Sequence, residues 1–108
     1  MRADWGCAME ISTTVDGTSA TIALTGTLTV ASSPNLEAAF SDLPDDVLDI
    51  TLDMAALDYV ASAGLRVIVA QDKKERQNGG SLRIANPNDE VMEVFDVTGL
   101  IDILEIVQ

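Results

Sequence analysis

The segment from Leu52 to Ala70 contains the residues whose types and spacing could carry chemistry. It places Ser62 and Gly64 where a predicted strand gives way to a predicted buried helix. Ser62 is placed to be the N-cap of that helix, where its side-chain oxygen would accept hydrogen bonds from backbone N–H groups one turn further on. Gly64 removes a side chain at the helix start, so another group could approach the backbone closely there. The unpaired N–H groups and the positive end of the helix dipole favour an anion at this position.

Three hypotheses compete for the role of Ser62. In the first it only caps the helix, which contributes about 1 kcal/mol to stability. In the second, the run 61–64 (Ala-Ser-Ala-Gly) mimics the nucleophile elbow of a hydrolase, but that mechanism needs a histidine base and the sequence has none. In the third, Ser62 is phosphorylated. A phosphoryl group would add about −1.5 to −2 charges and change what the surface presents to a partner.

Composition excludes several classes of function. Without histidine there is no Ser-His-Asp triad, and a Cys/His zinc site is nearly excluded, so we predict no catalytic residues, no metal site and no cofactor. Cys7 is the only cysteine, which fits a reducing compartment. A net charge of −12 argues against binding to nucleic acid or to an anionic membrane. No stretch approaches the ~20 apolar residues that span a bilayer, so a cytoplasmic protein is expected.

The few positive charges are concentrated in one window. Arg2 lies outside it, and the others are Arg66, Lys73, Lys74, Arg76 and Arg83. They indicate either a polarised surface that meets a charged partner or a solvated helix face. Arg66, one turn into the helix from Ser62, could pair with a partner's carboxylate or with a phosphate, or it could be a solvated arginine.

The elements that must position Ser62 follow from hydrophobic periodicity and turn signals. Strands are predicted over residues 10–15, 19–28, 47–54, 82–85 and 100–107, the last with room for a helical turn. Helices are predicted to open at Ser33-Pro34, at Ser62 and at Asn86-Pro87, and to stop at Pro44, Gly79 and Thr98.

Within these elements, the helix from Ser62 should be buried in its apolar first half and emerge into water in its charged second half. Tyr59 is predicted in a loop before this helix, where it either packs against the sheet or contacts a partner. Met92, Val94 and Phe95 are predicted to belong to the core rather than to a contact surface.

The element order β-β-α-β-α-β-α-β predicts an α/β domain. Strands that alternate with helices imply parallel pairing and right-handed crossovers, and the leading hairpin adds an antiparallel pair. We therefore expect a mixed sheet of about five strands with helices packed mainly on one face. One domain should cover residues 9–108, with residues 1–8 as a loose arm or expression remnant.

Several segments in order resemble the STAS domain of bacterial anti-sigma factor antagonists, and together they cover nearly the whole chain. The most specific part is the Ser-Ala-Gly-Leu-Arg core of the fourth of these six segments. The segments are Leu24-Thr25-Gly26-Thr27-Leu28, Ser33-Pro34-Asn35-Leu36, Leu52-Asp53, Tyr59-Val60-Ala61-Ser62-Ala63-Gly64-Leu65-Arg66, Thr98-Gly99-Leu100 and Ile103-Leu104.

The resemblance implies a partner-switching protein that is not itself an enzyme. Such a protein binds an anti-sigma factor, itself a serine kinase, and so frees a sigma factor. The kinase phosphorylates the serine matching Ser62, which abolishes binding, and a phosphatase restores it. A monomer is expected when the protein is free. The implied partner surface comprises Thr29, Tyr59, Ala61, Ser62, Ala63, Gly64 and Arg66.

Two positions depart from the family pattern. An acidic residue usually precedes the switch serine, where this chain has Ala61, and an aspartate usually follows the second strand, where it has Thr29. These departures favour one alternative, a non-phosphorylated STAS subunit of a larger lipid-transport or stress-signalling assembly. A module that senses an anion or nucleotide is a further alternative, because the helix start suits an anion.

Overall fold

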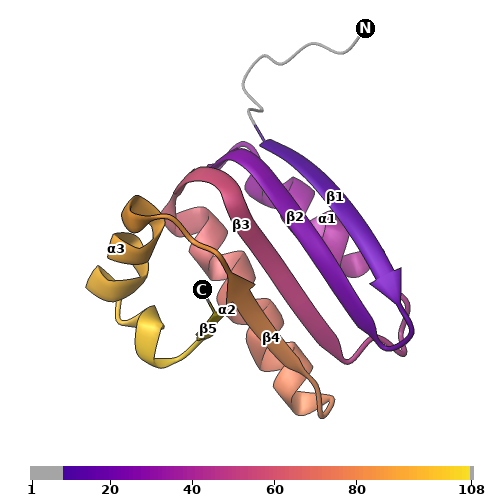
Figure 1. Cartoon of the computed structure of the whole chain (residues 1–108). Helices are drawn as coiled ribbons and strands as arrows, with labels where there is room; N and C mark the ends of the chain where they lie inside the picture. The colour runs from indigo at the N-terminus through magenta and orange to yellow at the C-terminus, as the bar shows by residue number, and fades with distance from the viewer. Residues whose placement is uncertain (1–8, 108) are drawn as a thin grey trace, which may run out of the picture.

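The computed structural model describes residues 9–107, so the arm predicted at residues 1–8 lies outside the described residues. Five strands form one sheet in the order in which they occur along the chain (Figure 1). The strands are β1 (Met9–Asp16), β2 (Ser19–Leu28), β3 (Asp49–Val60), β4 (Ser81–Ala85) and β5 (Glu105–Val107). The helices are α1 (Ser33–Ser41), α2 (Ser62–Gln77), α3 (Asp89–Val97) and the short 3₁₀ helix η1 (Leu100–Asp102).

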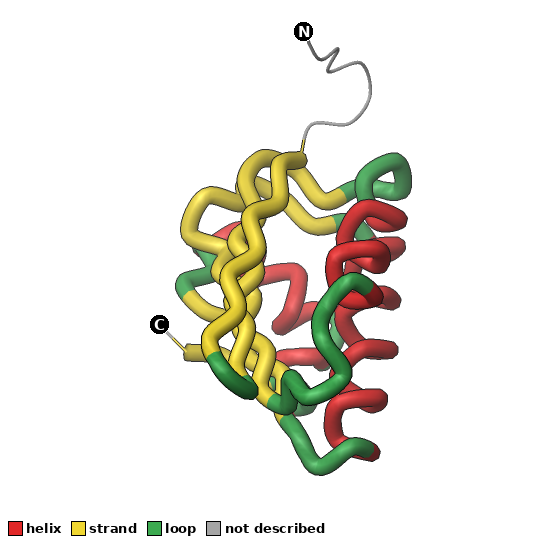
Figure 2. The backbone as a smooth tube through the Cα atoms, turned by 90° about the vertical axis from the view of Figure 1, so that its right-hand side faces the viewer, coloured by secondary structure: helices red, strands yellow, loops and turns green. Residues whose placement is uncertain are grey.

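The sheet is mixed, as predicted. β1 and β2 form an antiparallel hairpin that turns at Gly17, where φ is +63°, and β2 to β5 are all parallel neighbours. Each crossover steps in the same direction across the sheet, so right-handed connections place their helices on the same side. Figure 2 shows the strands as one layer and the helices as a second layer on one face, which confirms the prediction.

One apolar core lies between these two layers. Alternate residues of β2 and β3 point into it, because successive side chains on a strand point to opposite faces. The fully buried side chains include Ile22, Leu24, Leu52, Met54, Ile68, Ile84 and Phe95. The residues between them, such as Thr21 and Thr51, lie on the uncovered face, where an antiparallel or mixed sheet can meet water.

β3 is longer than predicted. The sequence suggested that the strand ends at Met54 and that Asp58-Tyr59 forms a loop, whereas β3 continues to Val60. The extension is held by β2, since Thr27 pairs with Tyr59 and Leu28 with Val60 after two register shifts. Gly26, with φ of +101°, lies at the second shift and allows the strand to bend there. The strand therefore leads almost directly into α2.

Two helix starts also differ from prediction. The sequence suggests Ser33 as the N-cap of α1 and Pro34 as its first helical residue, whereas Ser32 is the N-cap and Ser33 is already helical. The N-cap of α3 is Asn88 rather than Asn86, and its side-chain oxygen accepts from the Val91 N–H at 2.8 Å. Asn86 instead has φ of +56° and forms part of the preceding turn. Local capping preferences locate such ends only to within a residue or two.

α2 ends as predicted, with Asn78 as the C-cap and Gly79 at φ of +81°. The prediction that its second half emerges into water is only partly right. Asp72 and Glu75 are buried, because one face of this half packs against α1 and β4. Asp72 pairs with Arg76 at 3.2 Å, and this pairing reduces the cost of burying its charge. No helix within residues 9–107 is both long and apolar enough to cross a membrane.

Candidate functional site

The candidate site forms where two neighbouring parallel strands end. The carboxyl ends of β2 and β3 lie side by side, with Leu28 paired to Val60, and each strand leads into a helix within a few residues (Figure 1). The Ala61 N–H donates to the Leu28 carbonyl oxygen at 2.8 Å. This bond brings Ala61 and Ser62 beside Thr29, which directly follows β2. The two positions that depart from the family pattern are therefore neighbours in space.

Ser62 is not the N-cap of α2, which corrects the sequence prediction. The N-cap is Ala61, whose extended backbone (φ −92°, ψ 167°) lets its carbonyl oxygen accept from the N–H groups of Gly64 and Leu65 at 3.0 and 3.1 Å. Ser62 is the first helical residue and is exposed. Its hydroxyl makes no hydrogen bond to any residue that the structure describes. A free hydroxyl at a helix start is accessible to a phosphate-transferring enzyme.

The loop beside Ser62 is held rigidly by another serine. Ser32 is 0% exposed, and its hydroxyl accepts from the Thr29 N–H at 2.7 Å and donates to the Thr27 carbonyl oxygen at 3.0 Å. The backbone N–H groups of Ser32 and Ser33 both donate to the Thr29 carbonyl oxygen. Thr29 thus keeps a fixed, partly exposed position next to the start of α2.

Gly64 has a packing role instead of the open approach that the sequence suggested. It is buried, and a Cβ atom at this position would lie 2.5 Å from the Cγ and Cδ2 atoms of Leu28 and 3.3 Å from Val60. The group that approaches the glycine closely is therefore Leu28 of the same chain. Gly64 contributes to the site by letting α2 start tightly against the end of β2, not by offering backbone to a partner.

An open apolar hollow of about 470 Å³ lies next to Ser62, between α2 and the turn before η1. Arg66 and Lys73 contribute positive charge to its edge, and neither makes an ion pair with another residue in the described part of the chain. The lining residues are Ser62, Leu65, Arg66, Val69, Ala70, Lys73, Thr98 and Leu100.

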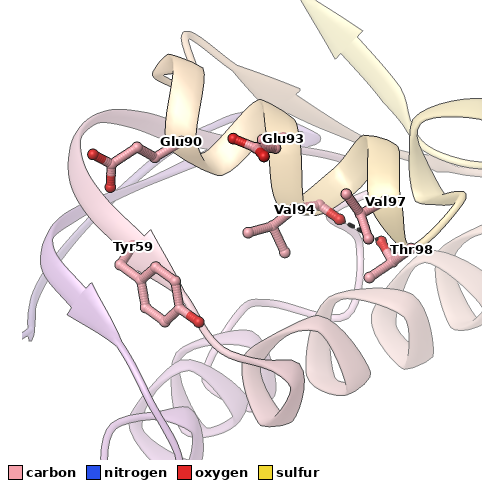
Figure 3. Close-up of a pocket in the computed structure, with 6 residues that line it drawn as sticks. All are labelled: Tyr59, Glu90, Glu93, Val94, Val97 and Thr98. Carbon is pink, nitrogen blue, oxygen red and sulfur yellow. Dashed lines mark hydrogen bonds between the residues drawn. The ribbon is translucent and has the colours of Figure 1, made fainter.

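A second hollow of about 450 Å³ lies between the end of β3 and α3. Figure 3 shows Tyr59 facing α3, with Val94 pointing from the helix toward it. Tyr59 is 46% exposed and Val97 79% exposed, so the surface is open and substantially apolar. Glu90 and Glu93 add two carboxylates. Thr98 lines both hollows, so this second hollow adjoins the one that Ser62 lines.

The cluster of positive charges predicted from the sequence does not form one patch. Arg76 is engaged by Asp72 and donates to the Ile103 carbonyl oxygen at 2.7 Å. Arg83 points to the face of the sheet opposite the helices and lies 3.4 Å from Glu105. Among the positively charged residues that the structure describes, Arg66 and Lys73 line the hollow beside Ser62. Within residues 9–107, no group of three or more acidic or sulfur side chains could hold a metal ion.

The structure thus brings together six of the seven predicted partner-binding residues at the surface, while the seventh, Gly64, is buried. The six are Thr29, Tyr59, Ala61, Ser62, Ala63 and Arg66, each at least partly exposed. The sequence did not predict that α3 lines a hollow next to Tyr59. Of the three residues predicted in the core, Phe95 is fully buried, Val94 is partly buried against the core and Met92 is partly exposed. Val94 also lines the second hollow, together with the exposed Val97. Their spacing of three residues was the available signal.

A mixed five-stranded sheet, helices on one face and an exposed serine at the start of the second helix define a STAS-type α/β domain. The family model described as "Mlab, STAS domain" matches residues 11–107, and the chain belongs to this family. A relative named anti-sigma-B factor antagonist, from Bacillus subtilis, is 32% identical over 83 residues, which cover 77% of this chain and 76% of the relative.

Solved structures agree with this fold. The unphosphorylated form of the anti-sigma factor antagonist SpoIIAA superposes with a TM-score of 0.75 at 20% identity, covering 94% of this chain and 89% of SpoIIAA. The phosphorylated form of SpoIIAA from Bacillus gives a TM-score of 0.71 at 19% identity, covering 94% and 92%. At this identity the likeness establishes the shared fold.

Proposed function

We propose that this protein is an anti-sigma factor antagonist controlled at Ser62. Its surface around Ser62 binds an anti-sigma factor that is a serine kinase, which releases a sigma factor, and phosphorylation of Ser62 ends the binding. The observation that carries the proposal is the exposed Ser62, whose hydroxyl makes no hydrogen bond within the described chain and which lines an open apolar hollow. The protein is the substrate of the kinase and has no catalysis of its own.

Physical chemistry supports a switch at this position. The start of α2 tolerates a phosphate locally, because unpaired N–H groups and the helix dipole favour negative charge there. A partner that covers the two hollows would desolvate the same spot. Enclosing a dianion in such a contact costs far more than leaving it in water, so phosphorylation would weaken binding without unfolding the domain. The name of the Bacillus subtilis relative supports the class of partner.

The first test of this proposal is phosphorylation. The full chain is incubated with ATP and the serine-kinase anti-sigma factor encoded nearest to it, and the products are analysed by mass spectrometry. We expect one added phosphate on Ser62 and none in Ser62→Ala. A phosphate on another serine, with Ser62 unmodified, would contradict the assignment.

The second test measures binding of the same anti-sigma factor by calorimetry. Ser62→Asp should weaken binding at least tenfold while leaving the circular dichroism spectrum unchanged. Ser12→Asp is the matched control, since Ser12 is an exposed serine on the uncovered face of the sheet, opposite the helix layer. It should bind as the unmodified chain does. Equal affinity for Ser62→Asp and the unmodified chain would reject the switch.

A second candidate is a STAS subunit of a larger assembly that is never phosphorylated. Ala61 and Thr29 favour it, because the structure brings these two positions side by side and neither supplies the usual carboxylate. In that case the surface around Ser62 would still bind a protein, but no phosphate would appear on Ser62 with any kinase encoded nearby. Ser62→Ala would then leave the function of the assembly unchanged.

A further inference from the structure

The hollow between Tyr59 and α3 combines three kinds of group on one small surface. Glu90 and Glu93 lie three residues apart, so they share one face of α3, and Val94 and Val97 continue that face. The Tyr59 side chain lies across the hollow from the helix (Figure 3). An aromatic ring, two carboxylates and an apolar floor form a site that suits a cation on an apolar stem.

The two carboxylates are available to such a group. Neither Glu90 nor Glu93 forms an ion pair with another residue of the described chain, and both are exposed. Glu90 lies in the first turn of α3, where the helix dipole also stabilises it, but Glu93 lies a turn further along and gains little from the dipole. The two glutamates share one face of α3, so their carboxylates repel each other, and a cation bound near both would relieve this repulsion.

From this geometry we propose that the hollow receives an arginine side chain of the anti-sigma factor. The apolar stem lies on Val94 and Val97, the guanidinium reaches Glu90 and Glu93, and its flat face stacks on Tyr59. Arginine fits better than lysine, because its planar fork can bond two carboxylates while it stacks on an aromatic ring. The inference rests on the proposed partner-binding role of the surface around Ser62.

Tyr59 joins this hollow to the switch. It lies three residues before Ser62 and is the penultimate residue of β3, and Thr98 lines both this hollow and the one beside Ser62. A partner anchored by arginine between Tyr59 and α3 is therefore held directly over the start of α2. The arginine determines the orientation of the partner, whereas the Ser62 hydroxyl determines whether the partner can remain.

A probe that needs no partner protein tests the hollow itself. The ¹⁵N-labelled full chain is titrated with N-acetyl-arginine-N-methylamide and followed by amide chemical shifts. We expect saturable shifts concentrated at Tyr59, Glu93, Val97 and Thr98, and none with the citrulline analogue, which keeps the shape but lacks the charge. Amide shifts spread over acidic residues across the whole surface, or equal shifts with the citrulline analogue, would overturn the inference.

Variants separate the site from general acidity. Glu90→Gln/Glu93→Gln and Tyr59→Ala should each abolish the localised shifts. Asp89→Asn removes one charge from the first turn of the same helix but does not line the hollow, so it should retain them. If Asp89→Asn lost the shifts to the same extent as Glu90→Gln/Glu93→Gln, binding in this specific hollow would be rejected. The shifts would then reflect the general negative charge of the surface.

Binding of the anti-sigma factor kinase gives the third arm. Glu90→Lys/Glu93→Lys should lower its affinity by roughly tenfold or more, as charge reversal at a complementary contact does, and the loss should be smaller at high salt. If the unmodified chain does not bind the kinase at all, the proposed function fails. The arginine titration then still shows whether the hollow binds an arginine side chain. If the kinase binds and charge reversal has no effect, the arginine assignment fails and the proposed function stands.

Discussion

Ser32 and Ser62 both lie at a junction between a parallel strand and a helix, and they differ in burial and in hydrogen bonding. Each lies where a parallel strand ends and a helix begins, and the two strands are neighbours. Ser32 is fully buried, and its hydroxyl bonds to the backbone of residues 27 and 29. Ser62 is exposed, and its hydroxyl has no hydrogen-bond partner in the described chain.

The difference follows from where each serine lies relative to its helix. Ser32 is the residue before α1 and folds back onto the loop, so its hydroxyl satisfies groups that would otherwise be buried without partners. Ser62 is already inside α2, because Ala61 occupies the residue before the helix. One serine therefore stabilises the loop, and the other leaves its hydroxyl available for modification. This comparison can be tested by substitutions with graded effects.

The largest effect is expected where α2 packs on β2. Gly64→Val would place side-chain atoms into Leu28, which is itself fully buried, so overpacking should lower the free energy of unfolding by about 3 kcal/mol in urea denaturation. Ala63→Val, one residue earlier and partly exposed, is the control and should change it little. Adding Leu28→Ala to Gly64→Val should recover part of the loss. If Gly64→Val left the free energy of unfolding unchanged, α2 would have to be able to shift away from β2.

The serine comparison itself is tested by two matched substitutions. Ser32→Ala leaves the Thr29 N–H and the Thr27 carbonyl oxygen without their bonds, which should cost about 2 kcal/mol. Ser62→Ala removes an exposed hydroxyl and should change stability by less than about 0.5 kcal/mol. Both are measured by urea denaturation of the full chain. Equal losses for the two variants would show that Ser62 has a structural role as well.

α3 offers a third helix start that sharpens the comparison. Asn88 caps this helix and also donates from Nδ2 to the Leu57 carbonyl oxygen at 3.0 Å. Asn88→Ala should cost about 1 kcal/mol, typical of a lost N-cap. Asn88→Asp keeps the acceptor for Val91 but loses the bond to Leu57, so its thermal midpoint should fall between those of the alanine variant and the unmodified chain. If the thermal midpoint of Asn88→Asp were as low as that of Asn88→Ala, the stabilisation would come from the hydrogen bond to Leu57 rather than from the N-cap.

The smallest effect concerns charge at the start of α2. Ser62→Asp should raise the free energy of unfolding by about 0.5 kcal/mol at low salt, because a carboxylate at a helix N-terminus interacts favourably with the dipole. The gain should disappear in concentrated salt, which screens exposed charges. Ser62→Asn, neutral and of similar size, is the control and should show no salt-dependent gain. A loss of stability in Ser62→Asp would argue that this position does not tolerate a phosphate.

Much of the fold was predictable because its signals are local. The hairpin turn at Gly17, the stop of α2 at Gly79 and the apolar periodicity of the strands and helices each depend on a few adjacent residues. The full length of β3 was not predictable, since Asp58 and Tyr59 carry loop signals and are held in the strand by pairing with β2. That α3 lines a hollow with Tyr59 was not predicted for a related reason, because only tertiary packing brings Val94 and Val97 to the same hollow as Tyr59.

The sequence by itself determined the class of fold, the place of Ser62 at a strand–helix junction and the exclusion of histidine-dependent chemistry, because these depend on residue order and composition. Only the tertiary structure decided how Ser62 is placed relative to the helix. The bond from Ala61 to Leu28, and the close approach of Leu28 to Gly64, position the first turn of α2 so that Ala61 is the N-cap and Ser62 faces outward. These contacts join residues more than thirty positions apart, so no local pattern could reveal them.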